Sequence, residues 1–183
     1  MSDRVRRAVT RLWGSIGKNG DLHGSPRFAA ELATQCNGKL ALVAPGVSKW
    51  SYGQQLEHLY RASLYVLDRL EESLAGHDPK ERMGFWGYGL MTAGFIPRGY
   101  FPTIPQLEPG AGTLAEIRPL QETLHRRLAA LRLNVRDIKR ARGKSRHPRM
   151  KYLTAGQWLF FGDIHHRHHL AIMRDIAKAA RAA

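Results

Sequence analysis

The chain has 183 residues, is 43% hydrophobic and carries a formal net charge of +14. This length and composition suit one globular domain with a substantial core and exclude a disordered chain. No apolar run approaches the roughly 18 residues that span a bilayer, and the first residues lack the apolar core of a secretory signal. The single cysteine, Cys36, excludes an intrachain disulfide, so we expect a cytoplasmic protein.

The positive charge lies in three segments. The excess of basic over acidic residues is +4 in residues 1–20, +8 in residues 132–151 and +3 in residues 167–183, and the rest of the chain is nearly neutral. Such segments bind nucleic acid or anionic membranes, or simply keep a protein soluble. Without an aromatic-rich RNA motif or zinc-finger spacing, any nucleic-acid binding should be weak, nonspecific and salt-sensitive. The densest basic patch comprises Arg140, Arg142, Lys144, Arg146 and Arg149.

Residues 1–40 are expected to form a basic, partly helical extension, and residues 41–183 the main helical domain. A short helix is predicted from Ser25-Pro26 to about Gly38, and the apolar stretch "KLALVAP" that follows is expected to be extended. We find no internal repeat and no second domain.

A capping box predicts the start of the first long helix. The Ser51 hydroxyl and the Gln54 amide are placed to satisfy each other's backbone N–H groups. The apolar residues that follow recur at three- and four-residue steps until Gly76, which is typical of an amphipathic helix with a glycine stop. This stripe comprises Leu56, Leu59, Ser63, Val66, Leu67, Leu70 and Leu74.

The second helix is predicted to run from Asp78-Pro79 to Pro97, with Glu81 completing another capping box. Its several glycines lower the helix propensity but allow a neighbouring backbone to approach closely. A loop rich in proline and glycine follows over residues 97–112. Its length exceeds that of most connections, and we expect it to pack over an opening.

Two further capping boxes predict the third and fourth long helices. Thr113 and Glu116 start a helix in which Pro119 implies a kink or a later start. Thr154 and Gln157 start the last helix, which is expected to run to about residue 180. Four long amphipathic helices predict a bundle.

Four histidines stand within five positions of the last helix. At 100° per residue, His165 lies in the middle of the apolar stripe. His168 and His169 lie on either side of that stripe, and His166 lies near its edge. His165 and His169 are one turn apart, so their rings can converge on one ion, and His58 of the first helix is a candidate third ligand. Three neutral imidazoles would leave coordination positions open, which is typical of catalytic zinc.

A structural role is the alternative for each of these residues. A single histidine on a helix flank, such as His58, is more often a hydrogen-bonded core residue than a ligand. His166 and His168 are also compatible with a solvated cationic helix end. The spacing by itself therefore leaves both a metal site and a structural cluster open.

The chain carries a recognisable pattern in two segments, "WSYGQQLEHLYRAS" and "HPRMKYLTAGQWLFFGDIHHRHHLAIM". It resembles the DinB-like (YfiT-like) metal-binding superfamily over residues 40–176 and is most similar to a branch of unknown function. The resemblance implies an all-α, DinB-like four-helix bundle with an extra N-terminal segment. It also implies that His58, His165 and His169 hold a divalent metal ion, with zinc or nickel favoured and iron as a further candidate. The features that carry it are Trp50 before the capped helix with His58, His147-Pro148 in the connection, Leu153-Thr154 with Trp158, and the H-x-x-H-H run 165–169.

The resemblance further implies an enzyme that acts on a small-molecule substrate. Relatives include thiol-dependent transferases and isomerases, so we expect a metal-dependent thiol transferase or hydrolase with a low-molecular-weight thiol as cosubstrate. His166 and His168 are candidates for outer partners of the ligands or for a proton relay, and the sequence identifies no general base. The alternatives are a noncatalytic, metal-stabilised bundle and a module that binds nucleic acid or an anionic surface through residues 132–151. A homodimer is compatible with each of them.

Overall fold

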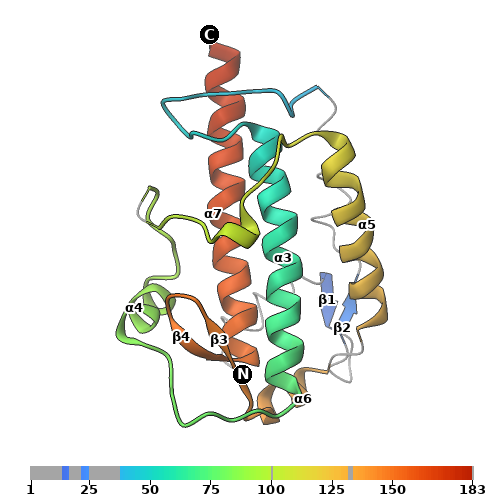
Figure 1. Ribbon diagram of the computed structural model, residues 1–183, viewed down its shortest axis with the longest axis vertical. Helices are drawn as coiled ribbons and strands as arrows, with labels where there is room; N and C mark the ends of the chain where they lie inside the picture. The colour runs from blue at the N-terminus through green and yellow to red at the C-terminus, as the bar shows by residue number, and fades with distance from the viewer. Residues whose placement is uncertain (1–13, 17–21, 25–37, 100, 132–133, 183) are drawn as a thin grey trace.

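The computed structural model of the chain describes residues 14–16, 22–24, 38–99, 101–131 and 134–182. Three long helices dominate this part, and the central one lies between the other two (Figure 1). The expected all-α bundle is therefore confirmed. The long helices are α3 (Tyr52–Leu74), α5 (Leu114–Ala130) and α7 (Ala155–Ala182), and the connections contain α4 (Phe85–Ala93), the 3-10 turn η1 (Pro105–Leu107) and α6 (Val135–Arg140).

Two small antiparallel sheets accompany the helices. The first pairs β1 (Gly14–Ile16) with β2 (Leu22–Gly24), and the second pairs β3 (Lys144–His147) with β4 (Lys151–Thr154). The β3–β4 hairpin occupies much of the basic connection, where the sequence indicated no strands. It docks on α3 through Ser145, whose hydroxyl donates to the backbone oxygen of Arg69 at 2.7 Å. The hairpin thus leads the chain from α6 into α7 while it contacts α3.

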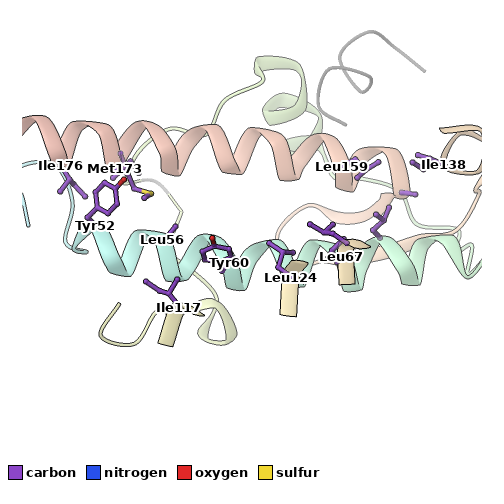
Figure 2. Packing of buried hydrophobic residues seen from close by; sticks show 14 of the residues in the cluster. Tyr52, Leu56, Tyr60, Leu67, Ile117, Leu124, Ile138, Leu159, Met173 and Ile176 are labelled. Carbon is purple, nitrogen blue, oxygen red and sulfur yellow. The ribbon is translucent and has the colours of Figure 1, made fainter. Parts of the chain in front are cut away.

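The central helix α3 has the predicted capping box. The backbone N–H of Gln54 donates to the Ser51 hydroxyl at 3.1 Å, and the N–H of Ser51 donates to the Gln54 side chain at 3.0 Å. The predicted stripe is buried except at its end, where Leu74 is partly exposed. Figure 2 shows how α3 residues of this stripe pack between residues of α7 and α5. Burial on both sides fixes the rotation of α3 about its axis, and therefore the direction of its polar side chains.

The capping boxes of the third and fourth helices are also confirmed. Thr113 and Glu116 bond reciprocally at the start of α5, which continues through Pro119 without a later start. The N–H of Thr154 donates to the Gln157 side chain at 2.9 Å, and that of Gln157 to the Thr154 hydroxyl at 3.4 Å. These caps define where each helix begins.

The prediction for the second helix was wrong in its extent and in its start. α4 spans only Phe85–Ala93, and the capping box expected at Asp78 and Glu81 does not form. The Asp78 carboxylate instead pairs with Lys144, and the backbone of Met83 forms a bridge with Lys151. The hairpin thus supplies partners to residues 78–84 that compete with a helix, and the glycine-rich sequence favours a helix only weakly to begin with.

The region before α3 also differs from the expectation. The stretch "KLALVAP" forms turns rather than an extended segment, and its carbonyls at Leu40 and Leu42 accept the N–H groups of Gly53 and Tyr52, each at 2.9 Å. These bonds satisfy backbone donors at the start of α3. The helix predicted over residues 25–38 and Cys36 lie outside the described residues, apart from Gly38 itself.

The loop between α4 and α5 is held against α3 by a buried carboxylate. Glu57 is fully buried, and its Oε2 accepts from the N–H of Gly110 at 2.9 Å and of Gly112 at 3.1 Å. At Gly53 any side chain would collide with the carbonyl of Gly112, so glycine permits this close approach. The loop therefore passes along α3, and η1 contacts it. Across the part of the chain that the structure describes, no helix is long and apolar enough to cross a bilayer.

Candidate metal centre

Three imidazoles meet at the interface between α3 and α7. His58 comes from α3, and His165 and His169 come from successive turns of α7. The Nε2 atom of His165 lies 3.4 Å from Nε2 of His58 and 3.2 Å from Nε2 of His169. His58 and His169 are buried, whereas His165 is partly exposed. We call this group the histidine trio.

Hydrogen bonds define the tautomers of two members of the trio. Nδ1 of His58 lies 2.8 Å from the carbonyl oxygen of Leu107 in η1, and Nδ1 of His169 lies 2.7 Å from Oε1 of Gln55. Both partners can only accept, so we infer that each Nδ1 carries the proton. The lone pair of each ring is then on Nε2, the atom that faces the other members of the trio.

Gln55 is itself held in place by a short chain of hydrogen bonds. Its Nε2 donates to the Ser48 hydroxyl at 2.8 Å, and the N–H of Trp50 donates to the same oxygen at 3.0 Å. These contacts orient the amide oxygen of Gln55 toward His169. Outer partners of this kind fix the ring orientation and raise the basicity of metal-bound histidines. The sequence analysis did not identify Gln55 or Leu107.

Burial keeps the trio neutral. The loss of solvent lowers the pKa of His58 below its usual value, and the Leu107 carbonyl opposes this effect in part. Burial, followed by the neighbouring imidazoles, holds the pKa values of His165 and His169 well below the usual range. Neutral imidazole is the form that binds metal ions, so no proton has to be displaced near pH 7.

The spacing of the trio can be compared with the geometry of a metal ion. With Zn–N bonds of about 2.0–2.1 Å and tetrahedral angles, two ligand nitrogens lie roughly 3.3 Å apart. The two Nε2 separations from His165, 3.2 and 3.4 Å, fall on either side of this value. One ligand atom from each histidine lies within 4.8 Å of the others. The donor set and its spacing thus fit a divalent ion that favours imidazole.

The two remaining histidines of the run occupy different surroundings. His166 is buried away from the trio, with Nδ1 2.6 Å from the Gly162 carbonyl and Nε2 2.9 Å from the Ser63 hydroxyl. Burial lowers the pKa of His166 to about 4. His168 is partly exposed, and its ring meets that of His169 edge-on at 4.9 Å. Burial lowers the pKa of His168, and a hydrogen bond to the backbone of Ile96 partly offsets it. Of these two histidines, His168 is the one whose ring contacts a ring of the trio.

The carboxylates next to the trio in sequence have other partners. Glu57 binds the loop backbone and also the guanidinium of Arg61, with Oε1 2.8 Å from Nε. Asp163 is buried and accepts from Nε of Arg167 at 3.1 Å. The chemistry of the trio is thus that of nitrogen ligands.

An aromatic group borders the trio on the side of His165. The ring of Phe161 lies 5.7 Å from that of His165, and His147 lies 4.7 Å from Phe161. Nδ1 of His147 accepts from the N–H groups of Arg149 and Met150, both at 3.1 Å. Burial lowers the pKa of His147 to about 4. The conspicuous His147-Pro148 of the sequence therefore organises the hairpin turn beside the centre.

The predicted basic patch lies on α6, the hairpin and the connection between them. Lys144 forms an ion pair with Asp78 and donates a hydrogen bond to the backbone oxygen of Pro79. Arg149 is exposed and donates to the backbone oxygen of Pro102 at 3.2 Å. The side chains of Arg140, Arg142 and Arg146 are exposed. The patch is thus mainly a solvated cationic surface, separate from the trio.

A family model of the DinB superfamily matches residues 21–173, and the chain belongs to this superfamily. The match begins earlier than the sequence resemblance, which started at residue 40. Searches of curated proteins and of solved structures find no match to the chain. Membership of the superfamily and the histidine trio are together compatible with a metal-binding protein.

Proposed function

We propose that the protein binds one divalent metal ion through the Nε2 atoms of His58, His165 and His169 and acts as a thiol transferase or hydrolase on a small-molecule substrate. The observation that carries this proposal is the convergence of three Nε2 atoms, two of which carry lone pairs because their rings donate from Nδ1. Imidazole ligands favour zinc or nickel, with iron as a further candidate.

The donor set supports a reactive centre. Three imidazoles leave at least one coordination position for an exogenous ligand, and the partial exposure of His165 gives that ligand a route of entry. When bound, a divalent ion lowers the pKa of a water molecule or thiol in the open position. His58 and His169, held by Leu107 and Gln55, keep the ligand geometry fixed during the reaction.

The transferase reaction assigns a role to His168. The thiol sulfur forms a bond to an electrophilic carbon of the substrate, and the leaving group departs with its bonding electrons. His168 is the candidate acceptor of the thiol proton, since its ring lies 4.9 Å from that of His169. His166 takes no part, since its two ring nitrogens face Ser63 and Gly162.

Metal content tests the ligand assignment. Protein purified without a histidine tag should bind about one ion per chain, and His169→Ala should lose most of it. His77→Ala is the matched control, because His77 is an exposed histidine outside the trio. Equal metal loss in the two variants would contradict the assignment.

Turnover tests the reaction. Metal-loaded protein is incubated with low-molecular-weight thiols and an electrophilic acceptor, and separately with ester and amide substrates. We expect one of these reactions to require the metal and to be lost in His58→Ala. Reaction at the same rate with metal-stripped protein would refute the enzymatic part of the proposal.

A noncatalytic metal clamp is the second candidate, and the position of the trio favours it specifically. One ion would join α3 to α7 at their interface, which holds the bundle together. This alternative predicts that metal raises the thermal unfolding temperature while no substrate is turned over. The two measurements together separate the candidates.

A further inference from the structure

Helix α4 exposes large aromatic side chains. Phe85 is 86% exposed and Trp86 69% exposed, Tyr88 is 51% exposed, and Phe95 just beyond the helix is 59% exposed. We call these four residues the aromatic patch. Clusters of exposed aromatic residues are costly in water and mark surfaces that bind a partner or a membrane.

The packing of α4 explains why the patch faces outward. The helix contacts the body of the protein through Gly87 and Met91, its two buried residues. A side-chain carbon at Gly87 would lie 2.5 Å from Cγ of Met83 and 3.1 Å from Cβ of Met150, so only glycine lets the helix sit this close. The helix contains no charged residue in its sequence, FWGYGLMTA. It is therefore an apolar element fixed to the surface by one narrow side.

Basic side chains lie on the hairpin next to α4, and the side chain of Lys151 lies beside Gly84, just before Phe85. The N–H of Gly84, the N-cap of α4, donates to the backbone oxygen of Met150 at 2.9 Å, so the helix and the hairpin lie side by side (Figure 1). Arg146, Arg149 and Lys151 of the hairpin region are exposed, and no acidic residue occurs between Lys139 and Lys151. We call these three residues the hairpin cations.

We propose that the aromatic patch and the hairpin cations together form an attachment site for an anionic lipid surface. The aromatic rings enter the interface between head groups and acyl chains, where amphipathic Trp and Tyr side chains are most stable. The hairpin cations lie at the level of the head groups, and each strengthens binding to an anionic surface about fivefold. The attachment is peripheral and independent of the histidine trio.

A second copy of the chain is a less suitable occupant of this surface. A two-fold interface buries the same patch of both partners, so the hairpin cations of both copies would be brought into one interface. Each chain also carries a formal net charge of +14. An anionic lipid surface is complementary to both the apolar and the charged parts of the site.

Single-stranded nucleic acid is also less suitable. Such ligands bind where aromatic rings stack on bases within a groove lined by cations. Here the aromatic residues project from a convex helix whose own sequence contains no cation and no amide side chain. The arrangement suits insertion into a soft interface better than intercalation between bases.

Vesicle flotation with the full chain tests the proposal. The protein should float with vesicles of phosphatidylcholine and phosphatidylglycerol, should not float with phosphatidylcholine alone, and should dissociate as salt is raised. The double variant Phe85→Ser/Trp86→Ser should lose most of the binding. The control Val43→Ser, at an exposed apolar residue before α3, should bind normally.

The contribution of charge has its own matched control. Arg146→Gln/Arg149→Gln should lower the partition constant roughly 25-fold, which is about fivefold for each cation. Lys178→Gln/Arg181→Gln removes the same charge from the opposite end of the bundle and should have a much smaller effect. Equal losses would mean that net charge alone drives binding and would overturn the proposal.

Tryptophan emission reports insertion directly. Trp86 is 69% exposed, so its insertion into the vesicle interface should shift the emission to shorter wavelength. Trp86→Phe should retain binding and lose this shift. Absence of binding to anionic vesicles at low salt would overturn the proposal. So would a dimer that Phe85→Ser/Trp86→Ser dissociates, or RNA binding through the patch that vesicles do not displace. Circular dichroism of each variant checks that the bundle is folded.

Discussion

Helices α3 and α4 depart from the usual distribution of side chains in opposite directions. α3 buries polar residues such as Gln55, Glu57 and His58, and each has hydrogen-bond partners. α4 exposes Phe85 and Trp86 and buries little of its own surface. Buried polar groups cost free energy unless they are paired, and exposed aromatic groups cost free energy unless they are covered. The buried polar side chains of α3 and α7 thus form the candidate metal centre, whereas the exposed aromatic side chains of α4 form the surface proposed to bind lipid.

Truncation of one apolar side chain in each helix gives the largest expected difference. Leu70 of α3 is completely buried, so Leu70→Ala should lower the free energy of unfolding by about 2–5 kcal/mol. Phe85 is 86% exposed, so Phe85→Ala should change it by less than about 0.5 kcal/mol. Urea unfolding measures both. A large loss in Phe85→Ala would mean that α4 has a packing role and would break the comparison.

Acid should destabilise the folded protein through its buried histidines. Burial lowers the pKa of His147 and of His166 from 6.5 to about 4, so the unfolded chain takes up protons at a higher pH than the folded chain. Stability is therefore complete above pH 6.5 and falls as the pH approaches 4, by on the order of 3 kcal/mol for each histidine. Urea unfolding of metal-free protein at several pH values measures this loss.

His147→Asn isolates one of these histidines. The asparagine oxygen can accept the N–H groups of Arg149 and Met150 in place of Nδ1, but it does not titrate. The variant should be less sensitive to acid than the wild-type chain. An unchanged pH dependence would show that His147 is already accessible to protons in the folded state.

Removal of an outer partner should weaken metal binding less than removal of a ligand. Gln55→Leu keeps the size of the side chain but leaves Nδ1 of His169 without its acceptor. We expect the metal affinity to fall about 10–100-fold, or roughly 1.4–2.7 kcal/mol. Isothermal titration with zinc measures the change, and Tyr88→Ala on α4 is the control that should leave affinity unchanged. An unaltered affinity in Gln55→Leu would show that the Gln55 contact does not support the centre.

The helix caps provide the smallest contrast. Ser51→Ala removes the side-chain acceptor of the α3 capping box and should cost about 1 kcal/mol. α4 has no side-chain bond at its cap, so Gly84→Ala removes no hydrogen bond and should cost less than Ser51→Ala. Thermal unfolding under one set of conditions compares the two. Equal costs would mean that the α3 cap is redundant with its tertiary contacts.

Helical periodicity and capping chemistry were sufficient to predict the long helices and to bring His58, His165 and His169 toward one interface. They failed at α4 and the hairpin, because the partners of Met83 and Gly84 are backbone atoms of residues more than sixty positions away. Non-local pairing leaves no periodic signal in so short a strand.

The outer partners of the trio were missed for a related reason. Leu107 accepts through its backbone oxygen, and since every residue has this atom, the residue type at position 107 gave no signal. Gln55 did leave a signal, because it stands one helical turn before His58 on a buried face. A buried amide one turn from one candidate ligand can thus accept from another ligand of the same site, here His169.

The bond from His58 to the Leu107 carbonyl has a consequence for how the sequence can diverge. Any residue except one that changes the backbone path presents the same oxygen, so substitution at position 107 cannot delete the contact. Other contacts also hold the loop: the N–H groups of Gly110 and Gly112 donate to Glu57, and the Gln54 side chain donates to the Gly110 carbonyl. Side chains of the loop that make none of these contacts can therefore change during evolution while the His58 ring keeps its orientation. The sequence of the loop can therefore vary at position 107 without loss of this hydrogen bond, because the acceptor is a main-chain atom.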